Sequence, residues 1–255
     1  MTKSDTNKAL IEYAVRLGDD SLILGHRLSE WCSNGPFIEE ELALANTSLD
    51  YLGRARMFYG YAAELSTIEI TEDDFAYTRD AREFQNHLIH ELPRGDFAFT
   101  MTRQLFVDLF NFEFLRLLSE SQDETLKAIA SKAIKETQYH LRRSKSWVKQ
   151  LGDGTRESHD RVQKALNSLW GYRIELFELD ELELQLVEAG IAVDSRKLAD
   201  AWHQKLKQIL NEATLTTPEQ EWIIRGGREG YHTESLGHIL TDLQFVHRSM
   251  PGLAW

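Results

Sequence analysis

The stretch LALANTSLDYLGRARMF, residues 42–58, combines apolar residues at helical spacing with a polar stripe that contains Asn46 and Asp50. Apolar residues at positions i, i+3, i+4 and i+7 indicate an amphipathic helix. The stretch therefore predicts a helix inside a bundle, with an amide and a carboxylate on one stripe. Polar side chains on the inner face of a bundle helix indicate either a metal site or a degenerate site that has lost its metal ligands.

The same helical spacing recurs along the rest of the chain, which contains only four prolines, so an all-α protein is expected. One domain is predicted over residues 1–255, with a core bundle at about 6–151 and additional helices at about 158–249. Several predicted helices exceed the usual length, which is typical of bundles. They span about residues 6–32, 39–65, 73–90, 96–120, 124–151 and 158–179, a short piece ending near Gly190, then 194–211 and 233–249.

Composition narrows the class of partner. Acidic residues outnumber basic ones by 41 to 29, and the formal net charge is −12. Such a charge disfavours nucleic acid and an anionic membrane surface as main partners. The N-terminus has no continuous apolar run and no stretch is long and apolar enough to cross a bilayer, so a cytoplasmic location is expected. The single Cys32, next to Trp31, is predicted to be a buried apolar residue.

Pairs of polar residues recur at the spacing of facing positions on antiparallel helices, roughly 25 to 35 residues. Asp20 and Asp50 are thirty residues apart (50 minus 20), while Gln104 and Asp108 lie 32 and 28 residues before Glu136 (136 minus 104, 136 minus 108). Each half of the predicted bundle thus has an amide or carboxylate on its first helix and a carboxylate on its second. This is the layout of a ferritin-like di-iron bundle.

The set of metal ligands is incomplete in both halves. The residue three positions after the second-helix carboxylate, where such bundles place histidine, is Gly53 after Asp50 and Tyr139 after Glu136. His140 lies one residue too far along. The interpretation that we favour is a degenerate site of buried polar groups that satisfy one another, because a lone buried carboxylate is costly. Its expected counter-charges are Arg16, Arg27 or Lys132. The alternative is a di-iron or di-manganese oxidase that uses Asp20, Asp50, Asp108, Glu136 and His140.

Five segments carry a resemblance to one family. They are LGDDSLILGHRLSEW (17–31), LALANTSLDYLGRARMFYGYAAEL (42–65), AIKETQYHLRRSKSWVKQLGDGT (133–155), LFELDELELQLVEAGIAVD (176–194) and GGREGYHTESLGHIL (226–240). Together they resemble the C subunits of bacterial phenylacetyl-CoA epoxidases, over nearly the whole chain. The last two segments are specific to that family rather than to ferritin-like bundles in general.

The resemblance implies a non-catalytic, ferritin-like structural subunit of a multicomponent monooxygenase in aerobic phenylacetate degradation. Its expected partners are the catalytic A subunit, which carries the di-iron centre, and the other subunits of the complex, with phenylacetyl-CoA near the interface. No cofactor is expected on this chain. The resemblance also implies a degenerate metal site in this subunit, with which Gly53 and Tyr139 agree. A stand-alone helical binding protein remains a further alternative.

Three other features invite a functional interpretation. The loop before the last predicted helix carries two arginines and free helix N–H groups that could bind a CoA phosphate, although packing against a partner or a neighbouring helix is the preferred interpretation. Its residues are Arg225, Gly226, Gly227, Arg228 and Thr233, the last as helix cap. His87 and His90, like His238 and His247, lack a carboxylate at ligand spacing in their own helices, so helix-surface positions are expected. The aromatics at 97–115 predict core packing, with an interface on a second face as the alternative.

Overall fold

The computed structural model of the chain describes residues 3–219, 222–250 and 253. In that part of the chain all regular structure is helical, with no strand. The all-α prediction is confirmed, and the long paired helices are consistent with a ferritin-like helical bundle. No helix of the described residues is long and apolar enough to cross a membrane.

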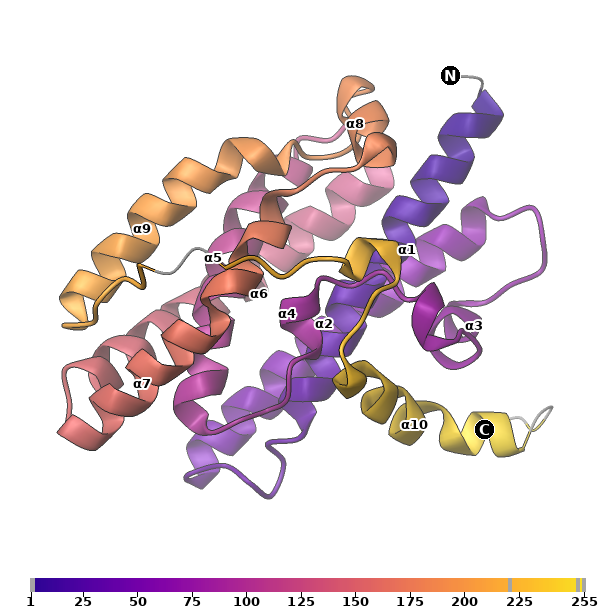
Figure 1. Cartoon of the computed structure of the whole chain (residues 1–255). Coiled ribbons are helices and arrows are strands. Elements are labelled where there is room, and N and C mark those ends of the chain that lie inside the picture. Colours follow the sequence, from indigo (N-terminus) through magenta and orange to yellow (C-terminus); the bar gives the residue numbers. More distant parts are fainter. Residues whose placement is uncertain (1–2, 220–221, 251–252, 254–255) are drawn as a thin grey trace. The chain divides into compact units, whose positions relative to one another are not determined.

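The chain divides into two compact units, Met1–Pro93 with Arg225–Trp255, and Arg94–Ile224. A single domain over the whole chain stays a prediction. The first unit contains seven helical elements among its described residues: α1 (Lys3–Ser29), α2 (Ile38–Leu65), α3 (Glu72–Tyr77), η1 (Ala81–Glu83), α4 (Leu88–Glu91), η4 (Gly227–Glu229) and α10 (Glu234–Ser249) (Figure 1).

The first unit is built on the antiparallel pair α1 and α2. Two glycines of α1 allow the close approach, because a Cβ at Gly18 would lie 2.3 Å from the Tyr59 ring and one at Gly25 would lie 3.1 Å from Leu52. The Ser48 hydroxyl also donates to the Gly25 carbonyl at 2.7 Å. These contacts fix the register of the two helices.

The connection from α1 to α2 corrects one prediction. Trp31 is buried, but its neighbour Cys32, which was predicted to be buried, is exposed. The chain turns away from α1 directly after Trp31, since α1 ends at Ser29. Burial of an aromatic residue therefore does not extend to the residue beside it in a turn.

The helix predicted at 73–90 is wrong, because the structure divides this segment into α3, η1 and α4. Reciprocal capping by Thr71 and Asp74 begins α3, and the same arrangement of Asp80 and Glu83 begins η1. Between η1 and α4 the backbone N–H groups of Gln85 and His87 donate to the carboxylates of Asp19 and Asp20, both at 2.8 Å. Bonds to α1 thus take the donors that a continuous helix would have used.

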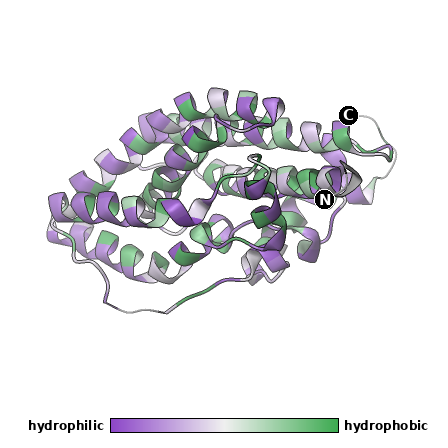
Figure 2. Ribbon diagram, turned by 90° about the horizontal axis from the view of Figure 1, so that it is seen from above, coloured by the Kyte–Doolittle hydropathy of each residue, from purple (hydrophilic) through white to green (hydrophobic). Residues whose placement is uncertain are grey.

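The second unit is built on α5 and α6, with further helices packed beside them. Its elements are α5 (Phe97–Leu118), α6 (Glu124–Gly152), α7 (Arg156–Leu169), η2 (Trp170–Phe177), α8 (Glu181–Glu188), η3 (Ser195–Leu198) and α9 (Ala199–Glu212). The single helix predicted at 158–179 is therefore an α-helix followed by a 3₁₀ segment. Hydrophobic and hydrophilic residues alternate along the ribbons of the helices, as Figure 2 shows.

Aromatic packing fills the core of this second unit. All ten residues from Met101 to Phe110 are buried. Phe106 meets the Trp202 ring edge-on at 5.3 Å between centroids, and the Trp202 indole donates to the Phe106 carbonyl at 3.1 Å. The core interpretation of this aromatic stretch is therefore confirmed.

Candidate functional site

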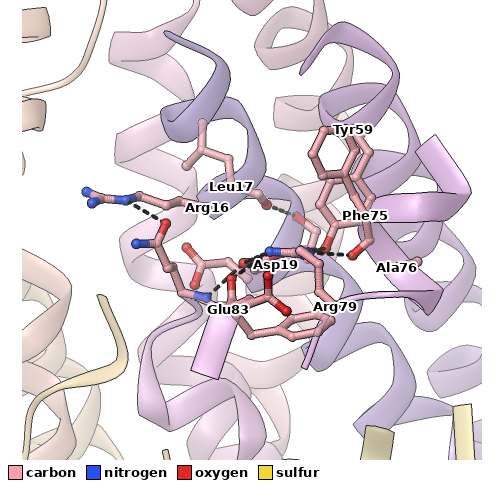
Figure 3. A network of polar contacts seen from close by, with 12 residues as sticks. Arg16, Leu17, Asp19, Tyr59, Phe75, Ala76, Arg79 and Glu83 are labelled. Carbon is pink, nitrogen blue, oxygen red and sulfur yellow. Dashed lines mark hydrogen bonds and ion pairs between the residues drawn. The ribbon is translucent and has the colours of Figure 1, made fainter. Parts of the chain in front are cut away.

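Buried polar groups of the first unit gather around two neighbouring carboxylates of α1. Asp19 is fully buried. One oxygen accepts the Tyr59 hydroxyl at 2.6 Å and the Arg79 guanidinium, and the other accepts Arg79 at 3.2 Å (Figure 3). The Arg79 guanidinium also lies over the Phe84 ring, 4.2 Å from its centroid. Donors of the same unit therefore satisfy both oxygens of this carboxylate.

The electrostatics of this first group favour a permanent ion pair. Burial alone would lower the pKa of Arg79, but the Asp19 carboxylate outweighs it and raises the pKa. Burial and the same carboxylate raise the pKa of Tyr59 well above its ordinary value. Neither Arg79 nor Tyr59 is ready to exchange a proton near neutral pH, so the arrangement holds α1, α2 and the segment after α3 together.

Asp20 forms a different group with two histidines and an arginine. The Arg228 guanidinium donates to its carboxylate at 2.7 and 3.2 Å. His90 Nδ1 lies 3.0 Å from one carboxylate oxygen and His87 Nδ1 lies 3.3 Å from the other. Both histidines are buried, whereas Asp20 keeps a small exposed fraction. We call Asp20, His87, His90 and Arg228 the Asp20 cluster.

Burial and neighbouring charges set the protonation states of Asp20 and His90. Burial would raise the pKa of Asp20, but Arg228, His87 and His90 hold it well below the usual range. Burial lowers the pKa of His90, although the Asp20 carboxylate opposes that effect. His90 is therefore neutral near pH 7, and because a carboxylate only accepts, its Nδ1 carries the proton. The Nε2 atom of His90 is buried and has no hydrogen-bond partner among the described residues.

A third group joins Glu91 to the start of α10. The Glu91 side chain is fully buried and accepts His232 Nδ1 at 2.7 Å and the Thr233 backbone N–H at 2.6 Å. Asn86 donates to the same carboxylate at 2.9 Å. Burial would lower the pKa of His232, but the hydrogen bond and charge of Glu91 raise it above its ordinary value. Glu91 therefore supplies the anion at the N-terminus of α10.

The loop before α10 packs against α1, as the preferred interpretation expected, but the predicted capping role of Thr233 is wrong. Thr233 precedes α10 but its side chain makes no capping bond, and its own backbone N–H donates to Glu91. Arg228 points inward to Asp20 rather than outward to a ligand. Arg225 is exposed, Gly227 is buried, and Gly226 adopts a φ of 130° that favours glycine.

The predicted positions on α2 are half-buried or exposed rather than in the core. Ser48, Leu52 and Tyr59 of α2 contact α1. Asp50 is half-buried, and Gly53 is exposed with no atom within 4 Å of where its Cβ would lie. The counter-charge of Asp20 is Arg228, so the prediction of Arg16, Arg27 or Lys132 is wrong for this carboxylate.

The predicted positions of the second unit differ in burial. Gln104, Asp108 and His140 are buried, and Glu136 is half-buried. Tyr139, which holds the place of the missing histidine, is 47% exposed. A carboxylate-bridged pair of metals needs a donor at the position of Gly53 and an inward donor at that of Tyr139. The residues present do not fit such a centre.

Sequence reasoning missed His87, His90, Glu91 and His232 as members of buried polar groups. No carboxylate lies at ligand spacing from His87 and His90 in their own predicted helix. Their partner Asp20 lies 67 and 70 residues earlier in the chain (87 minus 20, 90 minus 20). The prediction of surface positions for these two histidines is wrong. The available signal was the pattern HLIHEL, residues 87–92, half of which is apolar, so that burial of the whole segment is favoured.

Comparison with known proteins identifies the family of the chain. The family model described as phenylacetic acid catabolic protein matches residues 1–255. The chain belongs to this family. Within the phenylacetic acid catabolic proteins, it is 48% identical over 246 residues to the C subunit of the 1,2-phenylacetyl-CoA epoxidase of Escherichia coli (strain K12). That alignment covers 96% of this chain and 99% of the relative. The similarity thus extends over both units.

Proposed function

We propose that this chain is the non-catalytic structural subunit of a multicomponent phenylacetyl-CoA epoxidase, and that it docks on the di-iron catalytic subunit and stabilises it. The observation that carries the proposal is the 48% identity, over almost the full length of both chains, to the C subunit of such an epoxidase. In this role the chain contributes by holding the catalytic subunit in its active arrangement rather than by chemistry of its own.

The incomplete ligand set supports a role without catalysis. Gly53 offers no donor atom, and the Tyr139 side chain is largely exposed. The Asp19 ion pair and the Glu91 group are occupied by cations or donors of the same unit. Buried groups that are satisfied in this way stabilise a fold, whereas a catalytic centre leaves a position open for its substrate.

One face of α2 has the character of a docking surface for the catalytic subunit. Four large apolar side chains near its first half, between 47% and 65% exposed, are Phe37, Ile38, Leu42 and Leu49. On the helix, Ile38, Leu42, Leu49, Gly53 and Gly60 follow one another at intervals of four or seven residues and therefore share one stripe. Space is open above Gly53 and Gly60. An apolar stripe with small residues suits close packing against a helix of the partner.

The experiment is co-expression of this chain with the catalytic subunit, followed by measurement of complex formation, iron content and epoxidation. We expect the isolated chain to show no ring oxidation and the complex to be active. In the Leu49→Glu variant the charge on the stripe should weaken association at least tenfold. Ile68→Glu, which changes an equally exposed apolar residue outside α2, is the matched control and should assemble normally.

Two results would contradict the proposal. The first is two tightly bound irons and oxygen-dependent turnover in this chain alone, which would favour an oxidase with an atypical ligand set. The second is normal activity of the catalytic subunit without this chain. Normal assembly of Leu49→Glu would remove the docking face on α2 while leaving the subunit role in place.

A further inference from the structure

Three side chains of the Asp20 cluster offer metal-ligand atoms to one point. Asp20 comes from the middle of α1, while His87 and His90 flank the first residues of α4. One ligand atom from each of the three lies within 4.8 Å of the other two. Two imidazole nitrogens with one carboxylate oxygen are a donor set that suits zinc, cobalt and other late first-row divalent ions.

The shorter separations of these atoms are near those of a tetrahedral site. With metal–ligand bonds of about 2.0 to 2.1 Å, neighbouring donors in such a site lie about 3.3 to 3.4 Å apart. The observed separations are 3.3 Å from His87 Nδ1 to one carboxylate oxygen of Asp20 and 3.0 Å from His90 Nδ1 to the other oxygen, and the three ligand atoms all lie within 4.8 Å of one another. The side chains therefore have to draw together for all three atoms to reach one ion, from separations of at most 4.8 Å.

The surroundings also support coordination. The His87 backbone N–H donates to Asp20 at 2.8 Å and fixes the carboxylate in place. His90 would ligate through Nδ1, so the proton on that atom has to leave. The buried Nε2 of His90, which has no hydrogen-bond partner in the described part of the chain, can carry it, so that the ring stays neutral.

Arg228 occupies the remaining side of the cluster. Its guanidinium lies 2.7 Å from Asp20 and 3.3 Å from His87 Nδ1, where it supplies the positive charge that an ion would supply. The side chains of Asp20 and Arg228 are 13% and 14% exposed, against 6% and 4% for His87 and His90. Solvent therefore reaches the cluster from the side that Arg228 covers.

We propose that Asp20, His87 and His90 form a mononuclear site for a divalent ion such as Zn²⁺, and that Arg228 is its internal competitor. An ion enters as the guanidinium leaves. Departure of Arg228 also breaks its bond to the Gln85 carbonyl, so occupation of the site loosens η4 from the segment before α4. The site goes beyond the proposed subunit role, because it needs neither the partner nor the paired carboxylates of a di-iron centre.

The test uses the full chain without an affinity tag and Co²⁺ as the probe, read by visible absorption. We expect the wild type to bind one ion weakly and Arg228→Gln to bind it at least tenfold more tightly, because the competing charge is gone. Arg248→Gln is the matched control. It removes an arginine of the same unit that pairs with Asp80, and it should bind as the wild type does.

A change of one proposed ligand decides whether the cluster is the site. Adding His90→Gln to Arg228→Gln should abolish the increase in Co²⁺ affinity. Retention of that increase in the double variant would overturn the proposal. Equal affinity of Arg228→Gln and wild type would do the same. If circular dichroism shows that Arg228→Gln is unfolded, the wild type and His90→Gln decide alone, since equal Co²⁺ binding by these two overturns the proposal. Faster hydrogen exchange at 225–231 on Co²⁺ addition to the wild type would support it.

Discussion

Asp19 and Asp20 are neighbours in the sequence, yet different arginines neutralise them. Asp19 pairs with Arg79, and Asp20 pairs with Arg228. Successive residues of a helix point about 100° apart, so the two carboxylates leave α1 in different directions. Each therefore binds a different segment of the chain to the same turn of α1.

The ion pair of Asp19 and Arg79 should contribute strongly to the free energy of unfolding. Arg79→Gln leaves a fully buried carboxylate without its cation, which costs about 3 to 5 kcal/mol. Tyr59→Phe removes one hydrogen bond to the same carboxylate and should cost about 1 kcal/mol. Urea unfolding of the two variants measures both values. Equal and small losses would show that the pair contributes no more than one neutral hydrogen bond.

Single residues also show where sequence reasoning stops. Asp20 could be selected as a buried carboxylate because it lies on a predicted helix at a regular spacing. Its partner Arg228 could not, since 208 residues separate the two and no helical period relates them (228 minus 20). Gly53 and Tyr139 were recognised as departures from a ligand pattern because that pattern is local. Local periodicity thus identifies positions, whereas pairing across the fold needs coordinates.

At the scale of elements, the segment from Phe84 to Glu91 joins α1 to the start of α10. Its backbone donates to Asp19 and Asp20, while its carboxylate at Glu91 accepts His232. Periodicity predicted a helix here because the apolar residues alone suit one. The competing bonds from α1 carboxylates are invisible to that pattern, so the break in the helix could not be predicted.

The bond between Glu91 and His232 makes a prediction about pH. The pKa of His232 is raised in the folded chain above its ordinary value of about 6.5. The folded state thus holds the proton more tightly than the unfolded state does, and the stability gained is full below the unfolded pKa. That stability is lost as the pH rises through the folded pKa.

The measurement is the melting temperature of the wild type and of His232→Gln across about pH 5.5 to 9. Subtracting the two curves removes the contribution of His90, whose lowered pKa acts in the opposite direction. The wild-type advantage should be greatest at the acidic end and fall as the pH rises. A constant difference across this range would mean that His232 does not titrate in the folded state.

At the scale of the whole molecule, the first unit is discontinuous in sequence. It takes residues 1–93, and it is completed by residues from 225 onward. The all-α class and the two long hairpins follow from helical periodicity, and sequence predicted them. The return of the C-terminal segment to α1 does not follow from periodicity, because it depends on Arg228, His232 and Gln244 meeting partners that only the fold brings near.

Removal of the C-terminal segment should destabilise the first unit. A chain that ends at Ile224 loses the cation of Asp20, a carboxylate only 13% exposed in the complete unit, and the partner of the fully buried Glu91. It also loses Gln244, whose amide donates to the carbonyls of Ala76 and Arg79, both at 3.0 Å. Unpaired buried charges and unsatisfied carbonyls destabilise the structure around them. We therefore expect loss of stability in the first unit.

Hydrogen exchange resolves this effect by segment. In the chain ending at Ile224, the protection of α1 and of residues 84–91 against exchange should fall at least tenfold. The protection of α5 and α6 should stay within about twofold of its value in the full chain, because the residues of one compact unit exchange through shared openings. A chain ending at Ser249 retains all of α10 and serves as the control. Equal loss of protection in α1 and α5 would mean that the two units unfold together. Unchanged protection of α1 would mean that the C-terminal segment adds nothing to the unit it completes.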